Sequence, residues 1–349
     1  MRTLTAADGA AVYFKAIVLD LLIQLVGSVV VMIITMTAGL SDAAAMTVNF
    51  ILMALIQAVF LLAVYLHVRK KKLALGYPVK PVRWFTGCLA FLCAAVCVVC
   101  FILPAQWFAV LLENIGYRFS DPLSFDTPLN IALGAVVTVL IAPVCEELVF
   151  RGALLGGLVK KYGVAASVLL SGLAFSLMHM NPEQTVYQFF LGCVCAYFAI
   201  CSRSALPAML LHSGNNLIAL ILEFMPSSGA AFEPSPLWIA LTFIFAAAGI
   251  AAAYLIGRLM LRFESEPSGG RILAFEKNDK TEERVADFRT LLAVRKQEDA
   301  LDESDVTEGR RRNEILGKKT HVILLCLGLG VCAFMWLMVF MINISGVAV

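Results

Sequence analysis

The sequence predicts an all-α protein, a polytopic bundle of about nine transmembrane helices with a cytoplasmic N-terminus. Its composition is 60% hydrophobic and only 15% charged, whereas soluble domains carry about 25% charged residues. The apolar residues also form long runs without a charge, such as Leu89–Leu103 and Pro236–Gly257. A run of about 20 apolar residues is enough for a helix to cross a hydrocarbon core of about 30 Å. A strong asymmetry of basic residues between the loops supports the same fold class.

Nine segments of the chain are apolar and long enough to be expected as membrane spans. The first is expected to remain in the protein, because its apolar stretch is too long for a cleavable signal peptide. The fourth is longer than one straight crossing needs, so it should tilt or protrude from the bilayer. The expected spans are Phe14–Met36, Thr47–His67, Phe85–Leu103, Asn130–Val159, Val164–Met180, Val186–Ile200, Pro207–Phe224, Leu237–Leu259 and His321–Ile342.

The basic residues predict the orientation, because Lys and Arg collect in cytoplasmic loops. With the N-terminus inside, 26 of the 27 Lys and Arg residues fall on the cytoplasmic side, in loops or in the spans beside them, and Arg118 alone falls outside. An extra or missing helix would destroy this asymmetry, so it also supports the number of spans. The short apolar loops and the lack of a targeting signal favour the bacterial cytoplasmic membrane as the location.

The chain is expected to divide into five parts along its length. Residues 1–128 hold the first three helices and their loops, and residues 129–225 hold a core of helices four to seven. The eighth helix occupies residues 226–262 and the ninth helix with its tail residues 321–349. Between them, residues 263–320 are dense in charges of both signs, which predicts a cytoplasmic segment. The net charge of +2 and the lack of a P-loop or dinucleotide fingerprint give no reason to expect nucleic acid as a partner.

Two adjacent carboxylates in the fourth span mark the first motif, Glu146-Glu147-x-x-x-Arg151. An ionisable residue inside a span is costly and therefore points to function. Glu147 and Arg151 are four residues apart and can form an ion pair on one helix face. Glu146 lies about 100° away around the helix and has no local partner. Such a carboxylate can take a proton from water, which suits a general base.

Two further motifs place histidines in neighbouring spans. They are Phe175-x-x-x-His179 in the fifth span and His212-x-x-x-Asn216 in the seventh. Within each motif the two residues share a helix face, because they are four positions apart. One such histidine by itself is more often a packed, hydrogen-bonded residue than a reactive one. Three motifs in nearby helices reverse that expectation and predict a functional site.

The predicted hairpin between the fourth and fifth spans tests whether these motifs can meet. The midpoint of positions 146 and 179 falls in the turn Lys160–Gly163, so an antiparallel hairpin would bring Glu146 and His179 to the same depth. The site is then expected between the membrane midplane and the cytoplasmic face. Small residues on the fourth span permit close helix approach there. These residues are Gly152, Gly156 and Gly157.

Taken together, the three motifs resemble the signature motifs of the CPBP family. This family contains the type II CAAX prenyl endopeptidases and the bacterial CAAX-protease and bacteriocin-processing proteins, also called Abi proteins. The resemblance covers about Asn130–Phe224 and implies an intramembrane endopeptidase. It further implies that Glu146 activates the attacking water, that His179 helps to hold it, and that His212 and Asn216 stabilise the oxyanion.

The remaining motif residues take supporting roles in this resemblance. Glu147 and Arg151 would support the helix, and Phe175 would shape the pocket. The family is often labelled metalloprotease, and Glu146, His179 and His212 would form a plausible zinc set. The HExxH spacing that would favour zinc strongly is missing. Water activated by Glu146 without an obligatory metal is therefore the favoured mechanism, with zinc as the alternative cofactor.

The expected partners are the lipid bilayer and a peptide or membrane-protein substrate, prenylated or in precursor form. Nothing in the sequence selects one of these substrates or an oligomeric state. Two rival functions stay open. One is a non-catalytic scaffold or immunity protein of the same fold, which would use the polar cluster for binding. The other is a transporter lined by intramembrane polar residues, but the repeat symmetry typical of transporters is missing from the sequence.

Overall fold

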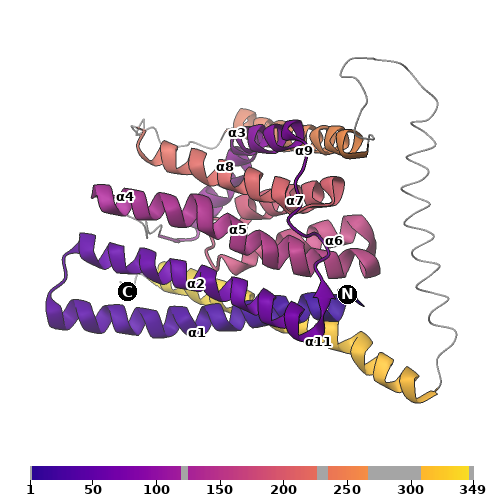
Figure 1. Cartoon of the computed structure of the whole chain (residues 1–349). Helices are drawn as coiled ribbons and strands as arrows, with labels where there is room; N and C mark the ends of the chain where they lie inside the picture. The colour runs from indigo at the N-terminus through magenta and orange to yellow at the C-terminus, as the bar shows by residue number, and fades with distance from the viewer. Residues whose placement is uncertain (1, 119–124, 226–234, 266–307, 346–349) are drawn as a thin grey trace.

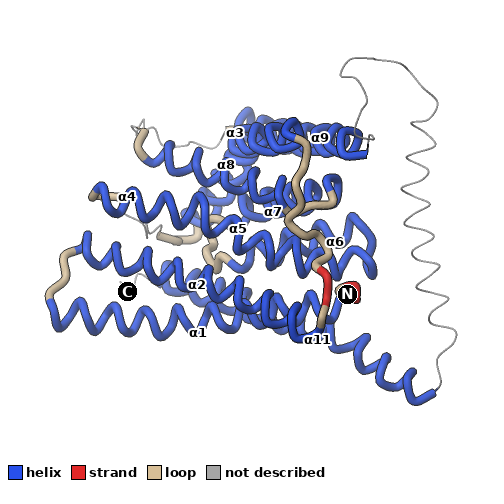
Figure 2. The backbone as a smooth tube through the Cα atoms, viewed as in Figure 1, coloured by secondary structure: helices blue, strands red, loops and turns tan. Residues whose placement is uncertain are grey.

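The computed structural model describes the chain except for residues 1, 119–124, 226–234, 266–307 and 346–349. The described part is helical apart from its connections and a two-stranded sheet, in agreement with the predicted all-α class (Figures 1 and 2). The elements are β1 (Arg2–Thr3), α1 (Ala6–Ala38), α2 (Asp42–Lys71), β2 (Leu73–Ala74), α3 (Trp84–Asn114), α4 (Pro128–Gly134), η1 (Ala135–Ile141), α5 (Ala142–Glu147), η2 (Leu148–Leu155), α6 (Gly156–Met178), α7 (Thr185–Ser202), α8 (Leu206–Glu223), α9 (Pro236–Ser265) and α11 (Glu308–Ser345).

Within the described residues, seven helices are long and apolar enough to cross a membrane. One of them, Pro128–Met178, is 51 residues long. It is interrupted at Gly163, where φ is 76° and ψ is 178°, a conformation that glycine adopts without steric cost. This break lies in the predicted turn between the fourth and fifth spans. The seventh predicted span forms α8, which is not among these seven helices. The number of nine spans therefore stays a prediction. The cytoplasmic location of the N-terminus stays a prediction as well.

The segment from α4 to α8 occupies the middle of the bundle (Figure 1). The hairpin of α1 and α2 packs on one side of it, together with α11. The helices α3 and α9 pack on the other side, against α7 and α8. The three motifs lie on α5 and η2, at the end of α6, and on α8. The fold therefore places the predicted site between two groups of covering helices. The charged segment predicted at 263–320 lies mostly outside the described residues.

The start of α1 is fixed by a capping box and by an ionic cluster. The Asp8 backbone N–H donates to the Thr5 hydroxyl, and the Thr5 backbone N–H donates to the Asp8 carboxylate, which satisfies free donors at the helix end. Asp8 also lies 3.1 Å from Nε2 of His67 and 2.7 Å from Nζ of Lys71. These contacts join the first turn of α1 to the last turns of α2.

The last helix, α11, packs into the bundle although it lies far from the motifs in sequence. The hydroxyl of Tyr13 on α1 lies 3.6 Å from the thiol of Cys332. The indole N–H of Trp336 donates to the Thr185 hydroxyl at the start of α7, at 2.7 Å. The predicted ninth span is thus a packed part of the fold, in contact with both α1 and the central segment.

The connection from α2 to α3 crosses the end of the bundle at which the N-terminus lies (Figure 2). It begins with β2, which pairs in parallel with β1. The Gly76 N–H then donates to the Gly152 carbonyl at 2.8 Å. Gly156 lies directly against this crossing, because a Cβ atom added to it would be 2.4 Å from the Gly76 Cα. The sequence assigned Gly156 to helix–helix packing, but it packs against the connection.

Replacing Gly156 by alanine is expected to destabilise the fold by about 1–3 kcal/mol, because backbone would have to move to admit the methyl group. Thermal unfolding of the detergent-solubilised protein measures this change. The matched control is Gly330→Ala on α11, where a Cβ atom would meet no atom within 4 Å. An unfolding temperature equal for the two variants would contradict the close packing of the connection against Gly156.

Candidate active site

The first motif lies on a helix whose winding changes twice within a few turns. The short α-helix α5, which carries Glu146 and Glu147, is flanked by the π-helical segments η1 and η2. Each π-turn adds a residue to the turn and rotates the following side chains relative to a regular helix, and such segments occur often at functional sites. All three charged residues of the motif are buried, with Glu146 6% exposed and Glu147 and Arg151 0% exposed.

Glu147 is the centre of a buried ionic group. Its Oε2 lies 2.9 Å from Nε of Arg151, so the predicted ion pair forms. Its Oε1 lies 3.1 Å from Nδ1 of His212 on α8. Because an ionised carboxylate only accepts, Nδ1 of His212 is the donor, and Nε2 is the ring nitrogen left for other partners. Arg151 in turn donates from Nη2 to the Gly192 carbonyl on α7 at 2.9 Å.

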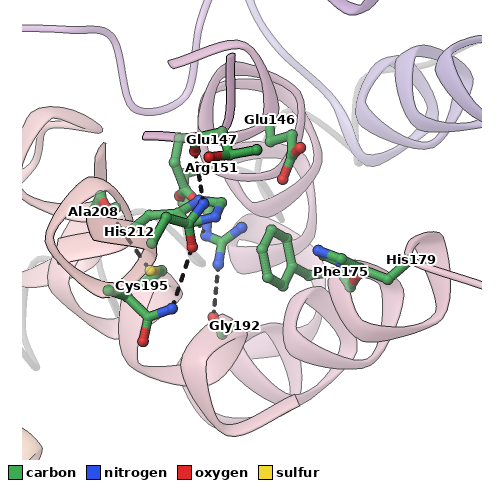
Figure 3. Close-up of polar contacts among 12 residues, drawn as sticks. Glu146, Glu147, Arg151, Phe175, His179, Gly192, Cys195, Ala208 and His212 are labelled. Atoms are coloured by element: carbon green, nitrogen blue, oxygen red, sulfur yellow. Dashed lines mark hydrogen bonds and ion pairs between the residues drawn. The ribbon is translucent and has the colours of Figure 1, made fainter. Parts of the chain in front are cut away.

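The Phe175 ring joins the second and third motifs. Its centroid lies 5.0 Å from that of His179 and 5.4 Å from that of His212, both in edge-on arrangements. The guanidinium of Arg151 lies 4.7 Å from the same ring centroid, within the range of a cation–π interaction. Phe175 therefore fixes the positions of both histidines and also stabilises the buried cation (Figure 3).

His179 ends α6 and is held by its own helix. Its Nδ1 lies 2.9 Å from the Phe175 carbonyl oxygen. A carbonyl only accepts, so Nδ1 carries the proton and Nε2 of the neutral ring is an acceptor. The next residue, Met180, has φ 50°, a left-handed conformation that is uncommon for a residue with a side chain. The helix thus stops directly after His179, which leaves this ring at the end of the helix.

Glu146 faces away from the ionic group around Glu147. Figure 3 shows its carboxyl group directed toward the side on which Phe175 and His179 lie. Its Oε1 accepts a hydrogen bond of 3.0 Å from Nε2 of Gln57 on α2. Its Oε2 is buried and has no hydrogen-bond partner among the described residues. The two adjacent carboxylates therefore differ: Glu147 is paired with Arg151 and bonded to His212, whereas Oε2 of Glu146 has no partner among the described residues.

Asn216 on α8 is held by two hydrogen bonds of its amide group. Its Nδ2 donates to the Thr138 carbonyl in η1 at 2.8 Å, and its Oδ1 accepts from Nδ2 of Asn215 at 3.2 Å. One N–H of the Asn216 amide stays outside these bonds, so the amide can still donate to a ligand. Its contact with η1 joins the third motif to the helix that carries the first.

Sequence reasoning missed the contacts that come from other helices. Gln57 was not identified as a site residue, although it is a polar residue in the middle of an apolar span. That signal was available, because intramembrane polar groups are costly, but Gln57 lies outside the three motifs. Gly192 and Thr138 contribute backbone carbonyls, and no residue type predicts such a role.

The alternative of a zinc site was tested against the donor atoms of this arrangement. Among the described residues, no group of three or more His, Cys, Asp or Glu side chains is arranged to hold a metal ion. Nδ1 of His212 is bonded to Glu147, and Nδ1 of His179 is bonded to the Phe175 carbonyl. These bonds leave Nε2 of both rings available, as in histidines that bind metals. Because the described residues show no grouped ligand set for zinc, no reaction step is derived through a metal.

Comparison with known proteins gave a match to a family model. Residues 128–218 match the model of the type II CAAX prenyl endopeptidases, described as Rce1-like. The matched segment runs from α4 into α8 and contains all three motifs, which confirms the family predicted from them. The seven apolar helices and this match to a membrane-protease family model together support an integral membrane protein related to that family. No curated protein and no solved structure gave a match to the chain.

Proposed function

We propose that this chain, in which residues 128–218 belong to the type II CAAX prenyl endopeptidase family, is an intramembrane endopeptidase that uses Glu146 as its general base. The observation that carries the proposal is the different state of the two adjacent glutamates. Glu147 is bound to Arg151 and His212. Glu146 keeps one buried oxygen without a partner among the described residues. A base must have such a free acceptor.

The attacking water is held by two acceptors in this mechanism. Oε2 of Glu146 takes one proton of the water, and Nε2 of His179 accepts a hydrogen bond from the other. His179 can do so because its Nδ1–H is already bonded to the Phe175 carbonyl. The water oxygen then attacks the scissile carbonyl carbon. Glu146 later gives this proton to the leaving amine, so it acts first as a general base and then as a general acid.

The oxyanion that forms in this step needs hydrogen-bond donors. In its protonated form His212 donates from Nε2, while Nδ1 stays bonded to Glu147. The remaining N–H of the Asn216 amide is the second donor. Donors aimed at developing charge in a site of low dielectric are usually the largest contribution to catalysis. Arg151, Glu147 and Phe175 hold His212 in place, so these three residues act through its position.

The proposed substrate is a peptide that is bound to the membrane. Family members of the CAAX type act on prenylated proteins, and their bacterial relatives on precursor peptides or membrane proteins. For this chain we propose a membrane-associated peptide of one of these kinds, and the bacterial cytoplasmic membrane as the place of the reaction.

The test is a cleavage assay with purified protein in detergent and in liposomes. A panel of fluorogenic peptides would include prenylated C-terminal peptides, acylated peptides and single-span precursor peptides. Wild type and the Glu146→Ala, His179→Ala and His212→Ala variants are compared. Cleavage that is lost in all three variants supports the peptidase. Cleavage that survives in Glu146→Ala would contradict the proposed base. A cellular phenotype that survives in Glu146→Ala would favour the scaffold.

Chelation gives an independent prediction. Cleavage is expected to continue, within about twofold, after treatment with EDTA and 1,10-phenanthroline, because the donor atoms of the described residues do not form a metal ligand set. Metal analysis of the purified protein should find zinc well below one equivalent. The control is a zinc peptidase under the same conditions, which should lose activity. Loss of cleavage that added zinc restores would instead support the metal alternative.

A further inference from the structure

The hydrogen bond between Gln57 and Glu146 joins the proposed site to a helix outside the matched family segment. Gln57 lies in the middle of α2, and Glu146 lies on α5. Nε2 of Gln57 donates to Oε1 of Glu146 at 3.0 Å, and both side chains are buried, at 7% and 6% exposed. We infer that α2 supplies Gln57 as a positioning residue, which holds the carboxyl group of the base. This inference rests on the proposed function.

The chemistry of the amide fixes the direction of this contact. An ionised carboxylate has acceptors only, so the nitrogen of the Gln57 amide must face it. A buried amide in an apolar helix is costly unless it is hydrogen-bonded. This contact satisfies the nitrogen of the Gln57 amide, whereas its Oε1 has no hydrogen-bond partner among the described residues. By binding Oε1 of Glu146, the amide determines which oxygen of this carboxyl group is available to take a proton from water. That oxygen, Oε2, is the one that has no partner among the described residues.

The other charged groups near Glu146 are already engaged. Those that act on it electrostatically are His212, Glu147 and Asp20. His212 and Glu147 are bonded to each other at 3.1 Å. Asp20 on α1 accepts from Nε2 of Gln24 at 2.8 Å. Within the described part of the chain, Gln57 is therefore the side chain that directly holds Glu146 by a hydrogen bond.

This contact gives the α1–α2 hairpin a part in the reaction. Without Gln57, Glu146 would keep its charge environment but could rotate about its side-chain torsions. If the base rotates away from the water, the rate of the chemical step falls. Substrate binding is little changed, because the peptide is bound by other groups. The inference therefore predicts an effect on kcat and little effect on KM.

The first experiment replaces Gln57 by methionine, which keeps length and volume but removes the donor. The kcat of Gln57→Met on the best peptide of the panel is expected to fall by about 10- to 100-fold, as for loss of one hydrogen bond to a charged group. KM should change by less than about threefold, and the thermal unfolding temperature should stay near that of wild type. The matched control is Gln24→Met, which removes the same kind of amide–carboxylate bond on α1. Its kcat should stay within about twofold of wild type.

The second experiment uses Gln57→Glu, which keeps the length of the side chain. When protonated, the introduced carboxyl group donates to Glu146 as the amide does, so activity is retained at acidic pH. When both carboxylates are ionised, they repel each other and the contact is lost. Activity of Gln57→Glu is therefore expected to fall as pH rises through a range in which wild type stays active. A residue that only fills space would leave the shape of the pH profile unchanged.

The outcomes separate this inference from the function on which it rests. If Glu146→Ala retains cleavage, the proposed base is wrong and the role of Gln57 falls with it. If cleavage needs Glu146 but Gln57→Met keeps kcat within about twofold, the positioning role alone is overturned. An equal loss in Gln57→Met and Gln24→Met also overturns it, because the effect would then come from polar residues of the hairpin in general. A fall in kcat confined to Gln57→Met, with the altered pH profile of Gln57→Glu, supports it.

Discussion

Glu146→Gln is expected to lower kcat by about 10²- to 10⁴-fold, the contribution of a positioned general base. The amide has nearly the same shape as the carboxylate, but it cannot take the proton from water. Because Glu146 forms no ion pair among the described residues, the substitution should leave the fold intact. The kcat on the best peptide of the panel and the thermal unfolding temperature measure the two expectations together.

Glu147→Gln is the matched control on the neighbouring residue. Glu147 is 0% exposed and bound to both Arg151 and His212, so its neutralisation leaves Arg151 without a counter-charge. This variant should therefore lose stability, whereas Glu146→Gln should lose turnover at unchanged stability. The assignment of the base would be wrong if Glu146→Gln unfolded early and Glu147→Gln alone lost turnover.

Local features of the site could be predicted from the sequence because they depend on short chain separations. Glu147 and Arg151 are four residues apart, and helical geometry alone brings such residues together. Gly163 follows two lysines and a tyrosine, and the chain reverses there, as the predicted hairpin required. The long apolar runs predicted the helices, since length and composition are enough for that.

Contacts between distant helices could not be predicted in this way. Gln57 and Glu146 are 89 positions apart, and Glu147 and His212 are 65 apart. In a membrane bundle most helix faces are apolar, so periodicity does not tell which helices are neighbours. The π-helical segments around α5 add a second difficulty. They rotate the side chains away from the regular spacing on which the sequence argument relied.

Helices outside the matched family segment also contribute to the candidate site. The family match stops at residue 218, yet α11 donates from Trp336 to Thr185. The Ser176 hydroxyl donates to the backbone carbonyl of Thr185. Ser176 lies inside the second motif. Helices outside the family segment thus reach two of the three motifs, one directly through Gln57 and one indirectly through Trp336 and Thr185. The candidate site is therefore built by helices inside and outside residues 128–218.

Arg151→Met is expected to destabilise the protein by about 3–5 kcal/mol, the usual cost of breaking a buried ion pair on one side. Arg151 and Glu147 are both 0% exposed, so the carboxylate would stay buried with only His212 beside it. The Phe175 ring would also lose the guanidinium that lies 4.7 Å from its centroid. Denaturant and thermal unfolding in detergent measure the loss.

The control is Arg69→Met on α2, where an exposed arginine lies 5.5 Å from the Tyr65 ring centroid. Its effect should be within about 0.5 kcal/mol of wild type, because no buried charge loses its partner. The double variant with Glu147→Gln and Arg151→Met removes both charges and should recover part of the stability lost in Arg151→Met. If the double variant were less stable than Arg151→Met by the full effect of Glu147→Gln, the two residues would act independently. The buried ion pair would then not be what holds His212 and Phe175 in place.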